Sequence, residues 1–178
     1  MCIRDSFGGW DGEQYVADTY VFDANADEWS QSVPMDAARG YVSAATLGGR
    51  IYVVGGYDGR QELTTCSIFD PESHVWDKCT PLAVGRGGLG LAALGGQLYA
   101  IGTAGQTTYL GFNERYNPAT DTWSPFETPL VGEWGGVGVA VLELTIYAVG
   151  GWDSGHLSVN QAYDPLPFRT YIPVSQQQ

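Results

Sequence analysis

The sequence predicts an all-β protein made of about four similar antiparallel sheets, most of them with four strands. Glycine is abundant, with 25 residues, and aromatic residues make up 13% of the chain but charged residues only 16%. This composition is typical of many short strands joined by tight turns. A glycine-led pair of residues ends an apolar run every 47 or 48 residues, and a tryptophan stands 20 residues after three of these pairs. Such a period indicates a repeat architecture.

Three kinds of marker keep the same spacing along the chain. The glycine-led pairs are Gly8-Gly9, Gly55-Gly56, Gly102-Thr103 and Gly150-Gly151. The tryptophans are Trp29, Trp76 and Trp123, and the aromatic residues that precede them by seven positions are Phe22, Phe69 and Tyr116. Because so many markers do not share one period by chance, we expect one structural unit per repeat.

Each repeat divides into four short strands separated by turn-forming residues. The first strands are expected at Tyr41–Leu47, Leu89–Leu94 and Val137–Leu142, and the second strands at Ile51–Gly56, Leu98–Thr103 and Ile146–Gly151. The third strand ends at the aromatic marker and the fourth begins near the tryptophan. A single sheet of this size cannot bury both of its faces, whereas similar sheets stacked around an axis can.

The sequence therefore predicts a β-propeller with three full blades and one partial blade. The full blades are expected at residues 34–80, 81–127 and 128–174, and the partial blade, which lacks its first strand, at 7–33. Residues 175–178 are expected to form a polar tail. An arc of this kind leaves two sheet faces without a neighbour, so missing blades of the same chain are among the expected partners.

The segments IYVVGGYDG and IFDPESHVW, at residues 51–59 and 68–76, resemble the kelch motif. The resemblance runs from residue 7 to about residue 174 and implies a kelch-type β-propeller, a fold that commonly has about six or seven blades. Two departures are mild. Thr103 replaces the second glycine of the third pair, and the last unit has no tryptophan, with Tyr171 nearest to that position.

The two ends of the chain differ in character. Residues 1–6, MCIRDS, resemble the translation of a transposase adaptor used in DNA library preparation, so we expect a sequencing scar there and leave these residues out of the fold. A genuine N-terminus is the alternative. The C-terminal segment PFRTYIPVSQQQ resembles the ending of secreted kelch-type proteins from filamentous environmental bacteria.

Cys66 and Cys79 flank one predicted turn, and antiparallel pairing around it would place them opposite each other. A disulfide is then in reach, provided that the two residues form a pair without backbone hydrogen bonds. It would close a loop of about 14 residues and stabilise the blade by about 3 kcal/mol. A disulfide favours an extracytoplasmic location, secreted or at the cell surface. Two buried thiols are the alternative.

Several functions are disfavoured by composition and motifs. A net charge of -12 repels nucleic acid, and no apolar run is long enough to span a membrane. Catalytic-triad, phosphate-loop and dinucleotide-binding motifs are absent from the sequence. A copper site, as in one kelch-like oxidase family, would need clustered tyrosines and at least two histidines. The two histidines of the chain, His74 and His156, are expected at opposite ends of their strands and so cannot share a metal. Asp23 and Asp27 have the spacing of a calcium loop without its glycine, which indicates a turn. We expect no cofactor and no metal.

The remaining candidate site is the face formed by the loops that precede each first strand and follow each second strand. Aromatic residues beside arginines and carboxylates are typical of binding hot spots. The predicted binding residues are Trp10, Arg39, Tyr57, Asp58, Arg60, Arg86, Glu133, Trp134, Trp152, Asp153 and His156. They predict a non-catalytic module that recognises a protein or a glycan.

Two other interpretations stay open. The Asp-Gly loops could be simple turns, with Arg39 and Arg86 bridging neighbouring blades. Alternatively, the chain could carry an enzyme, such as an epimerase or oxidase acting on a sugar or sugar acid, in which Arg39, Arg86 and Glu133 line an axial pocket. Convergence of these three side chains around a closed pocket would favour the enzyme.

Overall fold

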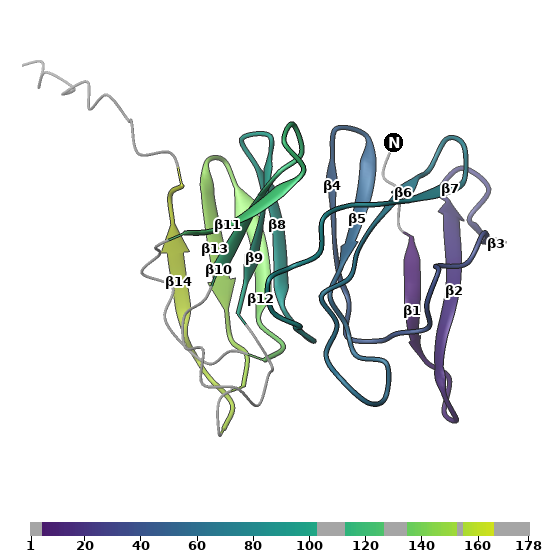
Figure 1. The fold of residues 1–178 in the computed structure, drawn as a ribbon, viewed down its shortest axis with the longest axis horizontal. Helices are drawn as coiled ribbons and strands as arrows, with labels where there is room; N and C mark the ends of the chain where they lie inside the picture. Colours follow the sequence, from purple (N-terminus) through teal and green to yellow (C-terminus); the bar gives the residue numbers. More distant parts are fainter. Residues whose placement is uncertain (1–4, 103–112, 127–134, 153–154, 166–178) are drawn as a thin grey trace, which may run out of the picture.

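The structure is a computed structural model that describes residues 5–102, 113–126, 135–152 and 155–165. In these ranges every regular element is a β-strand, so no helix is present that could cross a membrane. The strands form four antiparallel sheets. Figure 1 shows the first two on the right and the last two, which overlap in this view, on the left. The predicted all-β class, with blades of the kelch propeller type, is confirmed.

The first two sheets span residues 6–78. The first contains β1 (Ser6–Trp10), β2 (Tyr15–Asp23) and β3 (Glu28–Ser32), in that order. The second contains β4 (Ser43–Leu47), β5 (Arg50–Val54), β6 (Cys66–Asp70) and β7 (Val75–Lys78), also in chain order. The first sheet has the three strands expected of a partial blade. Its strand β1 begins at Ser6, where Ser6 pairs with Tyr20.

The third and fourth sheets have the same strand order, but the described part of the fourth sheet has three strands. The third contains β8 (Gly90–Leu94), β9 (Gln97–Ile101), β10 (Asn113–Asn117) and β11 (Thr122–Phe126). The fourth contains β12 (Gly138–Leu142), β13 (Thr145–Val149) and β14 (Asn160–Tyr163). The fourth strand that we expected for this last unit falls at residues outside the described ranges.

In the second, third and fourth sheets the first strand lies innermost, because β8 contacts both β4 and β12. The sheets therefore fan around a common axis, as the sequence predicts. Isolated bridges join Gly40 to Tyr57 and Gly135 to Trp152, so the loops before β4 and β12 lie beside the loops after β5 and β13. We call this end of the molecule, the lower edge in Figure 1, the loop face.

Apolar side chains fill the space between consecutive sheets. Alternate residues of a strand point to opposite neighbours, as strand geometry requires. In β5, Ile51 and Val53 pack in the cluster shared with the first sheet, while Tyr52 and Val54 pack in the cluster shared with the third sheet. A further cluster, which includes Ile101, joins the third and fourth sheets. Each internal sheet thus buries both faces.

The glycine pairs are explained by backbone contacts between units. Gly8 and Gly55 have φ of +61° and +67°, where a side chain is disfavoured. A Cβ on either would collide with the carbonyl oxygen of Arg39 or Arg86, respectively, in the next unit. The second glycine of each pair donates its N–H to that same carbonyl, over 3.0 Å and 2.7 Å. The pair therefore connects one blade to the next.

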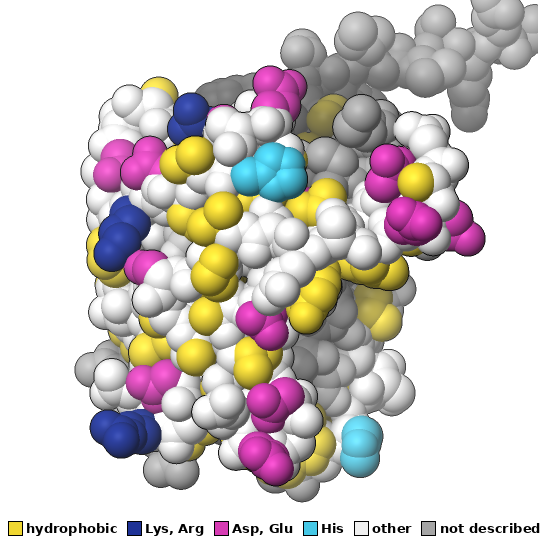
Figure 2. Space-filling model, turned by 90° about the vertical axis from the view of Figure 1, so that its right-hand side faces the viewer, with side chains coloured by type: hydrophobic (Ala, Val, Ile, Leu, Met, Phe, Trp, Pro, Cys, Tyr) yellow, Lys and Arg dark blue, Asp and Glu magenta, His cyan; other side chains and the backbone are white. Residues whose placement is uncertain are grey.

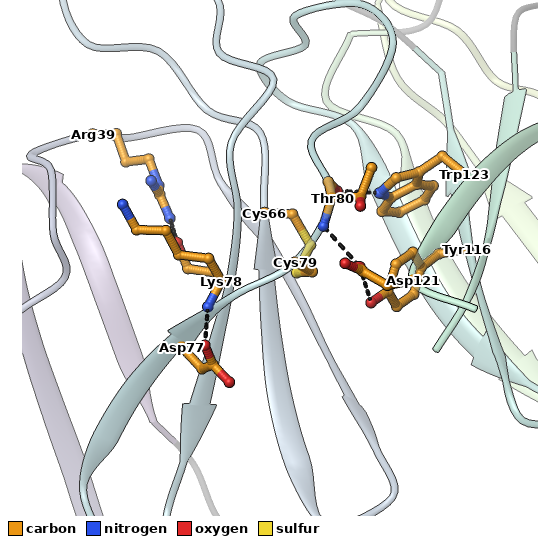
Figure 3. The surroundings of a disulfide bond; sticks show 10 residues. Arg39, Cys66, Asp77, Lys78, Cys79, Thr80, Tyr116, Asp121 and Trp123 are labelled. Carbon is orange, nitrogen blue, oxygen red and sulfur yellow. Dashed lines mark hydrogen bonds between the residues drawn. A yellow bond between two sulfur atoms is a disulfide. The ribbon is translucent and has the colours of Figure 1, made fainter. Parts of the chain in front are cut away.

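The repeated tryptophan also connects neighbouring units. The indole N–H of Trp76 donates to the carbonyl of Val33 over 2.9 Å, and that of Trp123 donates to the carbonyl of Thr80 over 2.8 Å. In both cases the acceptor lies at the end of the preceding unit. Figure 3 shows that the N–H of Thr80 also donates to Asp121, so Thr80 is bound to the third sheet through both of its backbone groups.

Cys66 and Cys79 form a disulfide, with their Cα atoms 5.2 Å apart (Figure 3). The bridge joins β6 to the residue that follows β7, within one blade. The expected condition that the two residues lack a backbone hydrogen bond is wrong, because the N–H of Cys79 donates to the carbonyl of Cys66 over 3.1 Å. The disulfide forms despite this pairing.

The outermost sheets keep apolar side chains that no described residue covers. Val149 in β13 is 50% exposed, whereas Ile101, at the same position of β9, is fully buried against the fourth sheet. At the other end Trp29 is 54% exposed, whereas Trp76 is partly buried. Figure 2 looks onto this end of the stack, where hydrophobic side chains extend down the middle of the surface.

Candidate functional site

The loop face is built from short turns whose first residue is an aspartate. The Asp11 carboxylate accepts hydrogen bonds from the N–H groups of Glu13 and Gln14, both at 2.8 Å. Asp58 does the same with Arg60 and Gln61. These backbone donors hold the pKa of both carboxyls below their usual range. Asp58, a predicted binding residue, therefore also shapes the turn that carries Arg60.

Two arginines of the predicted binding set do not reach the surface. Arg39 is 0% exposed and Arg86 is 1% exposed, and burial lowers the pKa of both guanidinium groups. Arg86 donates to Glu114 over 2.9 Å and to the carbonyl of Gly102. Their expected place in a binding surface is therefore corrected. They follow the loop in sequence, but their side chains turn into the protein.

Arg39 and Arg86 differ in how their charge is compensated. Arg39 donates to Ser67 over 2.9 Å, and its nearest carboxylate, Asp36, is 3.8 Å away and about one-third exposed. Two further guanidinium nitrogens of Arg39 have no hydrogen-bond partner among the described residues. The structure favours the interpretation in which these arginines bridge parts of the fold rather than contact a ligand.

Aromatic residues from three loops form a continuous patch on the loop face. Tyr15 lies at its centre, with ring centroids 5.0 Å from Trp10, 5.7 Å from Tyr57 and 6.5 Å from Tyr41. Trp10 and Tyr41 are exposed. Burial among these rings raises the pKa of Tyr15. Exposed aromatic groups held in such a cluster are the usual anchors of protein interfaces.

A cavity of about 420 Å³ lies beside this patch, near the axis. Three aromatic residues, Tyr41, Tyr57 and Trp152, line it together with Glu62. The glycine pairs at positions 87–88 and 135–136 complete the lining, and because they lack side chains the cavity stays open. Burial raises the pKa of Glu62, although a hydrogen bond from the backbone of Gly87 acts in the opposite direction. We call this cavity the axial pocket.

The other predicted residues are distributed unevenly. His156 is exposed on the loop face and bridges to Trp152, while Arg60 is exposed at a turn. Glu133, Trp134 and Asp153 lie outside the described residues. His74 lies in the turn between β6 and β7, where its Nδ1 is 2.7 Å from the Ser32 hydroxyl. The described ranges contain no cluster of three or more His, Cys, Asp or Glu side chains able to hold a metal.

Sequence reasoning missed Tyr15 and Tyr41 as members of the site. Tyr41 had a usable signal, because the equivalent positions in the next two units are Gly88 and Gly136. An aromatic residue at a position where other repeats have glycine indicates a local requirement. Tyr15 has no such signal, since it follows a turn at the start of β2 and resembles an ordinary strand residue.

Stacked antiparallel sheets around an axis, with their loops gathered at one end, define a repeat protein of the β-propeller class. The family model described as the KLHDC2/KLHL20/DRC7 Kelch-repeats domain matches residues 6–151, most of the chain. The chain therefore belongs to the kelch-repeat family, whose domains are typical protein-interaction modules. A comparison with curated proteins found no match.

Proposed function

We propose that this chain is a non-catalytic binding module that recognises a partner protein through the aromatic patch and the axial pocket of its loop face. The observation that carries the proposal is the cluster of Trp10, Tyr15, Tyr41 and Tyr57 next to a pocket with a largely apolar lining. Aromatic groups of this kind supply a large contact area at a low entropic cost. A glycan is the less favoured ligand.

Selection from a random peptide library tests the proposal directly. We expect peptides enriched on the wild-type protein to lose at least about tenfold in affinity on Trp10→Ala and Trp152→Ala variants. The matched control is Trp29→Ala, which removes an equally exposed tryptophan from the end of the stack. Failure to enrich any peptide, or equal loss in all three variants, would contradict a binding site on the loop face. A glycan array on the same variants separates the two ligand classes.

The enzyme hypothesis gains no support from the geometry. It requires Arg39, Arg86 and Glu133 around an axial pocket, but both arginines are buried and neither lines the pocket. Glu133 falls outside the described residues. No specific observation therefore favours an epimerase or oxidase.

An extracytoplasmic location, in a secreted or cell-surface protein of bacterial type, is proposed together with this function. The disulfide between Cys66 and Cys79 supports it, because such bonds persist in oxidising compartments. Alkylation of thiols in intact cells that express the natural gene gives the test. Recovery of this cysteine pair in the reduced form would contradict the location.

Further blades of the same chain are proposed as partners for the two end faces. The exposure of Trp29 and Val149, at positions where inner sheets bury their side chains, supports this. The isolated 178-residue chain should then bind an apolar dye or self-associate. A monomer that binds no dye would contradict the proposal.

A further inference from the structure

The repeat has a left-handed backbone at the position of Tyr41, where the other two described units have glycine and only Tyr41 carries a side chain. The φ of Tyr41 is +53°, in the left-handed region that disfavours side chains, and the equivalent residues Gly88 and Gly136 have φ of +71° and +64°. Strained residues of this kind concentrate at ligand sites. The Tyr41 ring is 67% exposed and forms one wall of the axial pocket. The strain therefore places an aromatic face on this pocket.

The pocket carries negative charge without a neighbouring cation in its described lining. Glu62 is the charged residue among the described lining residues, and it is partly buried. Arg60, two residues before Glu62, is exposed at its turn and is not among the described lining residues. Arg39 and Arg86 are buried in the protein, and Arg86 is paired with Glu114. The chain as a whole has a net charge of -12. An anionic ligand would be repelled here, whereas a cation would be attracted.

We infer that the axial pocket binds an alkylammonium group, presented as a lysine side chain of the partner protein, with Tyr41, Tyr57 and Trp152 around it and Glu62 as its counter-charge. The faces of tyrosine and tryptophan rings attract cations through their quadrupole. The carboxylate of Glu62 adds a direct ion pair in a partly desolvated site, where charges interact more strongly than in water. The methylene groups of a lysine side chain suit the apolar walls.

This inference depends on the proposed function and names the group that the loop face would recognise. Gly136 leaves room for that group, because a Cβ on it would have no atom within 4 Å. A tyrosine at Gly136 would copy the backbone geometry of Tyr41 and place its ring in the pocket. Two substitutions therefore test the inference. Y41G removes one wall of the axial pocket, and G136Y fills the space inside it.

The experiment follows the Trp152 indole N–H signal by NMR while a small probe is added. The probes are N-acetyl-lysine methylamide and its neutral counterpart N-acetyl-norleucine methylamide, which differ only in the terminal ammonium group. We expect the lysine probe to bind at least about fivefold more tightly than the norleucine probe. E62Q should lower the affinity for lysine about threefold and leave that for norleucine unchanged.

Two further variants distinguish binding from folding. Y41G should weaken lysine binding about fivefold, yet unfold at nearly the same temperature as the wild type, because glycine accepts the left-handed conformation. G136Y should abolish binding of both probes. Equal binding of the two probes, or no effect of E62Q on lysine, would overturn the inference.

The two proposals can fail separately. If selected peptides bind the loop face but tolerate replacement of every lysine, the proposed binding function stands and the inference that the axial pocket binds a lysine is refuted. Binding of the lysine probe without any peptide enrichment would refute protein recognition by the wider face and leave the pocket chemistry intact.

Discussion

Arg86 and Glu114 form a buried ion pair, with 2.9 Å between the guanidinium and carboxylate groups and both side chains 1% exposed. Glu114 also accepts a hydrogen bond from the N–H of Ala83, at 3.0 Å. One repeat earlier, Arg39 and Ser67 occupy the same two positions, and a hydroxyl stands where the carboxylate would be. This difference between repeats provides two stability experiments on the same structural position.

Replacement of Glu114 by glutamine should destabilise the protein by about 3 kcal/mol, because it leaves the Arg86 charge buried without its counter-ion. The measurement is the urea midpoint of unfolding. The double variant Arg86→Met with Glu114→Leu should recover most of this loss, since it removes both charges. A loss below about 1 kcal/mol for Glu114→Gln would show that the pair does not contribute in this way.

Replacement of Ser67 by glutamate should raise the unfolding free energy by about 1 kcal/mol, because it gives Arg39 the partner that Arg86 already has. The gain should vanish when Arg39 is changed to methionine in the same protein. Thermal unfolding of the single and double variants measures both effects. A lower melting temperature for the single variant would mean that Asp36, 3.8 Å from Arg39, already compensates its charge.

Replacement of Trp123 by phenylalanine should cost about 1 to 2 kcal/mol, because the carbonyl of Thr80 loses its indole donor and the smaller ring leaves space. The same change at Trp29 is the control, since that side chain is 54% exposed. Chemical unfolding compares the two variants. Equal effects at both positions would contradict the role of the indole as a connection between blades.

Reduction of the disulfide should lower the melting temperature, because a loop of about 14 residues is then free in the unfolded chain, at a cost of about 3 kcal/mol. The variant with both Cys66 and Cys79 changed to serine should match the reduced protein and be insensitive to reductant. Alkylation before reduction should label only Cys2 of the three cysteines. Labelling of all three would show that the bond is not formed.

Acid should destabilise the protein through its turn aspartates. Backbone N–H groups hold the pKa of Asp11 and Asp70 below the ordinary value of 3.8. Their contribution to stability is therefore complete above that value and is lost as the pH falls through the lower pKa of the folded state. The variant Asp11→Asn with Asp70→Asn should lose less thermal stability between about pH 5 and pH 2 than the wild type.

The matched control for the acid experiment removes two neighbouring charges. Glu13→Gln with Glu72→Gln changes the net charge by the same amount at positions adjacent to the two turns. If this control flattens the acid transition as strongly as the aspartate variant, general charge repulsion rather than the turn hydrogen bonds would explain the pH dependence.

The fold could be predicted because the markers of the repeat are residues that the backbone itself requires. Gly55 avoids a collision with the Arg86 carbonyl, and Trp76 satisfies the carbonyl of Val33. Each repeat makes the same contact with its neighbour, so the same residue types recur at a fixed spacing. The register between Cys66 and Cys79 followed from the same antiparallel geometry.

The candidate site was less predictable because position along a loop does not determine where a side chain points. Arg39 and Arg86 stand in loop positions, but their guanidinium groups turn inward to Ser67 and Glu114. Their recurrence at one position of the repeat was a sign of a structural role. The importance of Tyr41 depends on its φ angle, which a sequence read without comparison between repeats does not reveal.

The hydrogen bonds from Gly9 and Gly56 to carbonyls of the following unit have a consequence for biosynthesis. During translation the strand that carries the glycine donor is made well before the arginine whose carbonyl accepts its hydrogen bond. A newly made blade therefore gains its final geometry only after the next few dozen residues have emerged. Folding should advance from the N-terminal side, one repeat behind translation.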